Sequence, residues 1–153
     1  MTTIARVPTP LVNDIAGEAY LGLLDLAQRT ESLVGLVWRE QLTFSASAQQ
    51  LADELKPSLV EERRTDEWPG TRLFGHQAWY RLYRCDDHAL PILARAERLY
   101  GWHNPDFPED ISFHLPTGEC WLLSVAHEKL SQCRPELFDP ALSSKLFALL
   151  GKV

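Results

Sequence analysis

The sequence has few cysteines and no long apolar run. Its three cysteines are an odd number at wide, irregular spacing, so a framework of structural disulfides is not expected. The longest apolar runs, such as residues 33–38, are far shorter than the about 20 residues that a membrane-spanning helix needs. The first residues include Arg6 but no apolar segment of signal-peptide length. We therefore expect a cytoplasmic protein with no membrane segment and with reduced thiols.

The short motifs of the commonest enzyme classes are also missing. The sequence contains no Gly-x-Gly-x-x-Gly, no phosphate-binding loop, no Gly-x-Ser-x-Gly and no Cys-x-x-Cys. His127 and Glu128 are followed by Ser131 where a zinc-protease helix has its second histidine, so they do not predict a metal site. We expect no cofactor and no metal, and we favour a non-enzymatic protein over an enzyme.

What the sequence does contain is typical of one globular domain. With 153 residues, 45% of them hydrophobic and 24% charged, the chain can bury a core without disulfides or metal. It has no repeat, no low-complexity tract and no domain linker. Residues 1–153 are therefore predicted to form a single domain, with residues 1–12 as an extended N-terminal arm.

The formal net charge is −6, and the acidic excess lies in the first and last thirds of the chain. Net negative charge disfavours nonspecific binding to nucleic acid and to membrane surfaces. It favours rapid encounter with a basic protein partner. In the middle, over residues 57–105, anions and cations balance, and every cation is an arginine.

Apolar residues at helical spacing predict helices near both ends of the chain. A first helix is expected from Asn13 or Asp14 to Arg29. A second helix is expected to be capped by Ser47 and ended by Pro57.

Two more helices are expected after residue 85. One is capped by Asp86 or Asp87 and reaches Tyr100. The last begins after Asp139, with Pro140 in its first turn, and ends before Gly151.

Strands are predicted between the helices. Residues 33–42 fit a half-buried strand, although periodicity also allows them to continue the first helix. Residues 59–60 fit a short strand before a charged loop, and residues 73–85 fit a long aromatic strand. Residues 111–115 and 121–125 alternate on either side of a turn and predict a hairpin. The fold class is therefore α+β: a single domain with a mostly antiparallel sheet and about four helices.

Arginine and aromatic residues alternate in the middle of the chain. In the predicted strand, Trp79, Arg81 and Tyr83 share one face, and the opposite face is the better core face. Binding hot spots are enriched in Trp, Tyr and Arg, so the first face is a candidate binding surface. The alternative is that a helix covers it and Arg81 reaches solvent along its aliphatic stem. The predicted binding residues are Trp68, Arg72, Trp79, Arg81 and Tyr83, followed by Trp102 and His103 in a loop.

The favoured function is a non-enzymatic binding protein, of the immunity or inhibitor kind, that neutralises or regulates a basic protein partner. The segment from Phe107 to Ile111, followed by Gly118, resembles a short Leu-Pro-x-Asp…Gly pattern of one family of immunity proteins. The doubled glycine of that pattern is missing, and we do not assign the chain to the family. The resemblance implies a protein partner and no particular site residue.

Two other functions stay open. A small enzyme of unrecognised family would use residues of the set His103, Asp110, His127, Glu128 and Cys85, and two of them lying close together in a pocket would support it. A nucleotide or phosphate sensor would use arginines beside aromatic rings. Its candidate residues are Arg63, Arg64 and Arg72, near Trp68 and Trp79.

Overall fold

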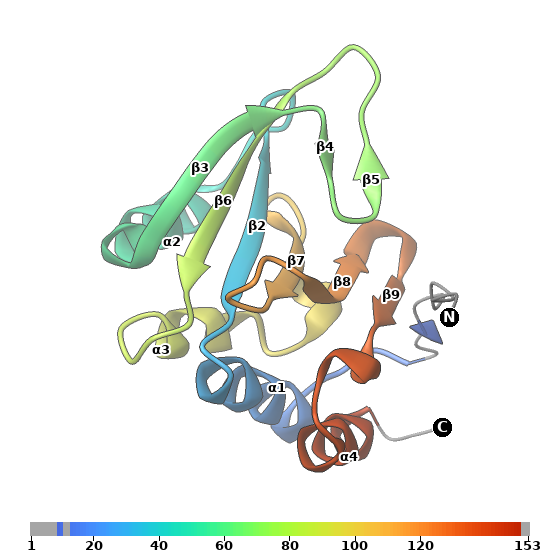
Figure 1. Ribbon diagram of the computed structural model, residues 1–153. Helices are drawn as coiled ribbons and strands as arrows, with labels where there is room; N and C mark the ends of the chain where they lie inside the picture. The colour runs from blue at the N-terminus through green and yellow to red at the C-terminus, as the bar shows by residue number, and fades with distance from the viewer. Residues whose placement is uncertain (1–8, 11–12, 151–153) are drawn as a thin grey trace.

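The fold is built on one seven-stranded antiparallel sheet (Figure 1). The computed structural model describes residues 9–10 and 13–150. In these residues the strands of the sheet are β1 (Thr9–Pro10), β2 (Leu33–Arg39), β3 (Leu59–Thr65), β6 (Ala78–Arg84), β7 (Glu109–His114), β8 (Cys120–Val125) and β9 (Leu130–Cys133). Their order across the sheet is β1-β9-β8-β7-β2-β6-β3, and every pairing is antiparallel.

Helices and a small hairpin complete the described part of the chain. The helices are α1 (Glu18–Arg29), α2 (Ala46–Leu55), α3 (Leu90–Leu93) and α4 (Pro140–Leu149), and the 3₁₀ turns are Lys56–Ser58, Ala94–Ala96, Leu99–Gly101, Ala126–Glu128 and Pro135–Leu137. Two short strands, β4 (Glu67–Trp68) and β5 (Thr71–Arg72), form a separate hairpin. In Figure 1, α1 and α4 lie side by side below the sheet, and the hairpin stands away from the helices. Helix α2 packs into the core through Leu51 and Leu55. None of the helices in the described ranges is long and apolar enough to cross a membrane.

The predicted α+β class, with an antiparallel sheet and four helices, is confirmed. The central strand β2 explains why periodicity left residues 33–42 ambiguous. This strand pairs with β6 on one side and β7 on the other, and all residues between its two ends are buried on both faces. A strand buried on both faces has a continuous apolar run rather than an alternating one, so its sequence resembles that of a buried helix. The strand alternative is therefore confirmed for Leu33–Arg39, and the helical continuation is wrong.

The two faces of the sheet have different covers. The large core lies between the sheet and the helices, and β2 contributes Val34, Leu36 and Trp38 to it. On the opposite face, a smaller cluster of Val37, Trp68, Ala78 and Tyr80 lies beneath the β4–β5 hairpin. Helices thus cover one face, and a hairpin from the same chain covers part of the other.

Several predicted boundaries are wrong for local reasons. The first helix begins at Glu18 rather than at Asn13 or Asp14, because the Asp14 carboxylate accepts the backbone N–H of Tyr100 at 3.0 Å instead of capping a helix. The third helix ends after one turn, and Glu97 then adopts φ 64°, in the left-handed region. The Asp86 carboxylate does accept the N–H of Ala89 ahead of this helix, at 2.9 Å.

The strands differ from their predicted lengths as well. The segment 61–65, predicted as a charged loop, continues strand β3, whose charged side chains are suited to the edge of a sheet. Strand β6 starts at Ala78 rather than at residue 73, after Gly75 with φ 83°. Strand β9 (Leu130–Cys133) was not predicted at all.

The hairpin and the last helix match their predictions. Strands β7 and β8 pair across the turn at Gly118, and the Asp139 side chain accepts the N–H of Leu142 at 2.9 Å. Of the predicted N-terminal arm, Thr9–Pro10 pairs with β9, and residues 1–8 and 11–12 lie outside the described residues, as does Gly151.

The cap of α2 gives a test of this architecture. Ser45, not the predicted Ser47, occupies the cap position and its hydroxyl accepts the N–H of Ala48 at 3.3 Å. We expect Ser45→Ala to lower the free energy of unfolding by about 1 kcal/mol, because it removes this bond. Ser47→Ala, inside the helix, should change it by less, since alanine favours the helix. Urea unfolding measures both, and a larger loss for Ser47→Ala would contradict the assignment.

Candidate functional site

The predicted arginine–aromatic face lies on the helix side of the sheet. Tyr83 is only 1% exposed and belongs to the large core, so its side chain is not presented to a partner. Arg81 forms an ion pair with Glu62, with Nε and Oε2 2.9 Å apart, and its guanidinium lies 5.5 Å from the ring centre of Trp38. Tyr83 and Arg81 therefore fit the alternative in which this face of the strand is covered, because both side chains are in contact with other residues of the same chain.

Trp79 is half-buried beside α2, where it lines a groove with Arg81. This α2 groove has a volume of about 450 Å³ and is lined by Trp38, Arg39, Glu40, Leu42, Phe44, Gln49, Ala52, Asp53, Trp79 and Arg81. Its three aromatic side chains face a rim that carries both positive and negative charge.

Trp102 is also a core residue rather than a loop anchor. Its side chain is 0% exposed, and its Nε1 donates to the hydroxyl of Tyr20 at 2.9 Å. That hydroxyl in turn donates to the backbone oxygen of Leu93 at 2.7 Å. The next residue, His103, is exposed. The loop therefore offers His103 to a partner but not Trp102.

The β4–β5 hairpin covers the other face of the sheet through Trp68. This side chain is buried, and its Nε1 donates to Oδ2 of Asp110 at 3.1 Å. The guanidinium of Arg39 lies 5.3 Å from the centre of the Trp68 ring. Gly70 at the hairpin turn lies so close to Leu123 and Val125 that an added Cβ would be 3.1 Å from each. The hairpin is thus fixed to the sheet at its indole and at its turn.

Two adjacent buried carboxylates lie behind Trp68. Glu109 and Asp110 are each 1% exposed, and burial raises the pKa of both. Oε1 of Glu109 lies 3.3 Å from Nε of Arg39, which opposes that rise. The hydrogen bonds from Trp68 and from the N–H of Ala126 do the same for Asp110. Each buried carboxylate therefore has a partner from another segment, as burial of charge requires.

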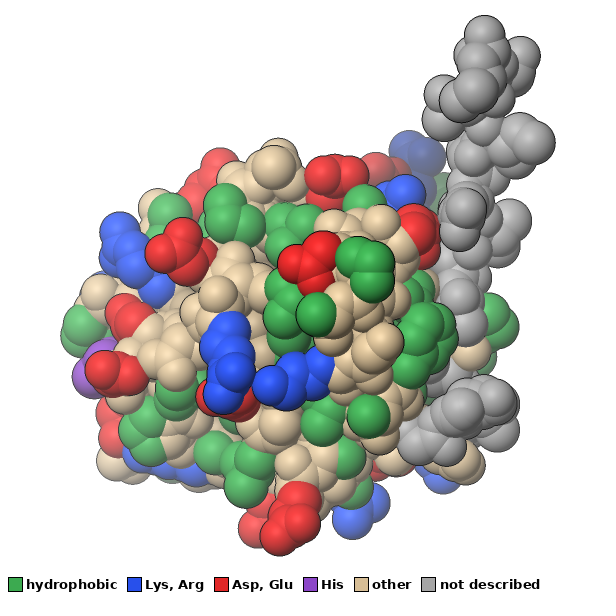
Figure 2. All heavy atoms as spheres, turned by 60° about the horizontal axis from the view of Figure 1, so that its bottom comes forward, with side chains coloured by type: hydrophobic (Ala, Val, Ile, Leu, Met, Phe, Trp, Pro, Cys, Tyr) green, Lys and Arg blue, Asp and Glu red, His purple; other side chains and the backbone are tan. Residues whose placement is uncertain are grey.

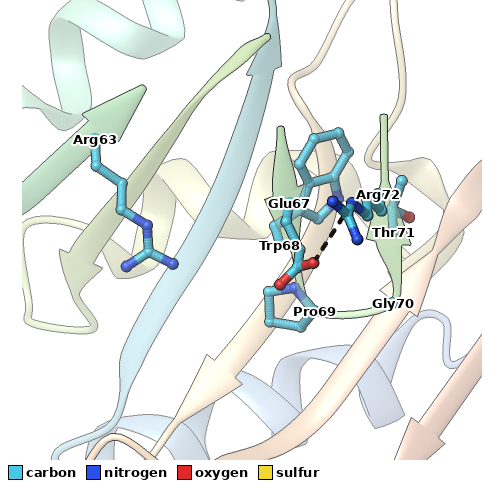
Figure 3. A pocket seen from close by; sticks show the side chains of 7 residues that line it. All are labelled: Arg63, Glu67, Trp68, Pro69, Gly70, Thr71 and Arg72. Atoms are coloured by element: carbon cyan, nitrogen blue, oxygen red, sulfur yellow. Dashed lines mark ion pairs between the residues drawn. The ribbon is translucent and has the colours of Figure 1, made fainter. Parts of the chain in front are cut away.

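A pocket opens between the hairpin and strand β3 (Figure 3). This hairpin pocket has a volume of about 570 Å³ and is lined by Arg63, Glu67, Trp68, Pro69, Gly70, Thr71 and Arg72. In Figure 3, Arg63 extends from its own strand on one side of the opening, and the hairpin side chains lie on the other. The pocket brings together Trp68 and Arg72 of the predicted binding residues.

The positive charges of Arg63 and Arg72, the two arginines of the hairpin pocket, are hardly neutralised by carboxylates of the described residues. Arg72 lies 4.0 Å from Glu67, and both side chains are more than 60% exposed, at 63% and 65%. Arg63 lies over the Tyr80 ring, 5.1 Å from its centre, and has no ion pair with any residue described. Arg64, a candidate of the same set, instead forms a two-bond pair with Glu40, with both distances 2.8 Å.

Tyr80 belongs to a buried polar network that the sequence did not reveal. Its hydroxyl lies 2.7 Å from Nε2 of His114 and 2.9 Å from the hydroxyl of Ser112. Burial lowers the pKa of His114 to about 4 and raises that of Tyr80 to about 12, so both stay neutral over a wide pH range. The hydrogen bonds of its hydroxyl therefore fix the position of the Tyr80 ring on which Arg63 stacks.

A second pocket gathers residues that the enzyme hypothesis had named. This histidine pocket has a volume of about 530 Å³ and is lined by Asp14, Arg98, Tyr100, Gly101, His103, Ala126, His127 and Lys129. Asp110 lies behind it, where Oδ1 accepts the N–H of Ala126 at 3.1 Å. His103 and His127, two candidates of the enzyme hypothesis, thus line one pocket, which is the arrangement that would support that hypothesis, so it stays open.

The remaining enzyme candidates are not part of this pocket. Glu128 is exposed and does not line it. Cys85 is buried beneath α1, where its Sγ lies 3.6 Å from the backbone oxygen of Leu24. Burial raises the pKa of Cys85 to about 12, so its nucleophilic thiolate is scarce at neutral pH.

A scan against protein-family models found no matching family, and searches of curated proteins and of solved structures found no match either. The function is therefore inferred from the pockets of this chain.

The buried state of His114 predicts how stability depends on pH. The pKa of this side chain falls from 6.5 to about 4 on folding, so its contribution to stability is complete above pH 6.5 and is lost as the pH falls towards 4. Between pH 7 and pH 5 the linkage amounts to about 2 kcal/mol. We expect His114→Gln to reduce the loss of unfolding free energy over this range by about that amount.

The exposed His76 provides the matched control. Chemical denaturation of wild type, His114→Gln and His76→Gln gives the unfolding free energy of each at pH 7 and at pH 5. The quantity compared is the difference between the two pH values for each protein, rather than its absolute stability. Equal pH dependence in wild type and His114→Gln would contradict the buried, neutral state of His114.

Proposed function

We propose that the protein acts by binding another molecule, without catalysis of its own, and that the hairpin pocket holds an anionic group of that molecule. The observation that carries this proposal is the position of Arg63. Its guanidinium lines the pocket, rests on the ring of Tyr80 and has no carboxylate partner among residues 13–150.

The chemistry of the pocket favours a carboxylate or a phosphate. A guanidinium presents several N–H donors in a fixed plane that matches two oxygens of such a group. Arg63 from β3 and Arg72 from the hairpin provide two such guanidinium groups on opposite sides of the opening. Their internal competitor, Glu67, is 4.0 Å from Arg72 and exposed, and exposed pairs of this kind contribute little.

The rest of the surface favours a small anionic ligand over a nucleic acid. The chain has a net charge of −6, which repels a polyanion at long range. Figure 2 shows that on the face at the α1 and α4 end acidic and basic side chains are interspersed among apolar ones, with no broad basic area. In the hairpin pocket itself the positive charge is that of two arginines, Arg63 and Arg72, which suits one compact anionic group.

The α2 groove favours a second proposal, a basic protein partner that the protein neutralises or regulates as an immunity or inhibitor protein does. Half-buried Trp79 and Phe44 line this groove, and Asp53 at its rim has no ion pair in the described ranges. Aromatic anchors beside a free carboxylate suit a basic side chain of a partner. Under this proposal Asp53→Asn weakens binding, and Arg63→Gln leaves it unchanged.

The hairpin pocket is tested by thermal unfolding in the presence of phosphate- and carboxylate-bearing metabolites at constant ionic strength. We expect at least one compound to stabilise the wild type, by about 2.7 kcal/mol when its concentration is 100 times its Kd. Arg63→Gln and Arg72→Gln should each abolish most of that rise in Tm, because each removes a charge-assisted hydrogen bond.

Arg84→Gln is the matched control, since Arg84 is an exposed arginine that does not line the hairpin pocket. It should bind as the wild type does. A ligand whose effect survives in the Arg63→Gln/Arg72→Gln double variant binds elsewhere. The assignment is overturned if no anionic compound stabilises the wild type more than it stabilises this double variant.

A further inference from the structure

We infer that the histidine pocket is a separate binding site for a compact oxyanion, the phosphate or carboxylate group of a small molecule. The inference does not rest on the proposed function, because the histidine pocket and the hairpin pocket share no lining residue.

Cations outnumber carboxylates among the side chains of the histidine pocket. Arg98, Lys129, His103 and His127 line it, and its carboxylate is that of Asp14. That carboxylate is already engaged, since Oδ1 accepts the N–H of Tyr100 at 3.0 Å and Oδ2 lies 3.8 Å from a guanidinium nitrogen of Arg98. The charges of Arg98 and Lys129 therefore exceed that of the carboxylate, and a ligand that brings anionic acceptor oxygens complements them.

The backbone that carries these donors is held in place from the interior. The two 3₁₀ turns Leu99–Gly101 and Ala126–Glu128 form its walls, and a buried carboxylate, Asp110, accepts the N–H of Ala126 at 3.1 Å. On the other wall the Tyr100 hydroxyl lies 2.7 Å from the hydroxyl of Ser131. A site whose backbone is fixed in advance loses less conformational entropy on binding.

The negative charge behind the pocket, that of Glu109 and Asp110, is partly offset by groups outside the pocket. The nearby Glu109 is buried, and its carboxylate is paired with Arg39 at 3.3 Å on the side of the hairpin. A metal is also the poorer occupant. No group of three or more His, Cys, Asp and Glu side chains suited to a metal ion occurs in the described part of the chain. A ligand set that includes lysine and arginine suits an anion instead.

The experiment is an NMR titration of the full chain at pH 7, followed through backbone amide signals, with inorganic phosphate in one arm and acetate in the other. Sodium chloride holds the ionic strength constant. We expect saturable shifts at residues 98–103 and 126–130 with at least one of the two anions. A response to phosphate but not to acetate assigns a tetrahedral oxyanion, and a response to acetate assigns a carboxylate.

Variants identify the groups that bind. The double variant His127→Gln/Lys129→Gln should weaken the affinity by about tenfold or more, because it removes the ammonium charge of Lys129 and the imidazole of His127. Lys145→Gln, on the exposed side of α4, removes the same formal charge outside the pocket and should leave the affinity unchanged. Arg63→Gln should leave it unchanged too, which separates this site from the hairpin pocket.

Three results would overturn the inference. They are shifts that do not saturate with either anion, shifts confined to residues 63–72, and equal loss of affinity in Lys145→Gln and in the double variant. The amide spectrum of each variant without anion shows whether it is folded, and His127→Gln alone serves as the test if the double variant is not.

Discussion

Two hydrogen bonds to the buried carboxylate of Asp110 hold both pockets in place. One oxygen accepts the indole N–H of Trp68, which fixes the hairpin to the sheet, and the other accepts the backbone N–H of Ala126, which fixes a wall of the histidine pocket. Asp110 itself has φ 54°, in the left-handed region, where the β2–β7 pairing shifts its register. Aspartate tolerates this conformation better than most residues. A single side chain thus positions two segments distant in sequence.

Burial of this carboxylate has a cost that its surroundings offset. Burial raises the pKa of Asp110 and of neighbouring Glu109, while Arg39 and two N–H donors favour their charged forms. The same Arg39 stacks on the Trp68 ring, so the cation, the indole and the two carboxylates form one packed cluster. Such clusters are sensitive to loss of any member, because an unpartnered buried charge remains. The cluster makes the hairpin a fixed part of the fold.

Much of the fold was predictable because its signals are local. The β7–β8 hairpin has alternating apolar residues around a turn, and α4 has its capping Asp139 directly before Pro140. Errors occurred where distant groups decide local structure. Asp14 would cap a helix by its type, but Tyr100 takes its carboxylate. Strand β9 has too few residues for a periodicity to emerge, and its pairing with β8 defines it.

Spacing along short stretches of the chain is enough to predict the α+β class, the antiparallel hairpin and the residue types available for binding. Which arginines and aromatic residues come into contact depends instead on how distant segments pack in three dimensions. Tyr83 and Trp102 are buried in the core, Arg64 and Arg81 are paired with glutamates, and Arg63 shares a pocket with Arg72. Alternation shows which residues share a face of a strand. It cannot show which face a helix will cover, since that depends on long-range packing.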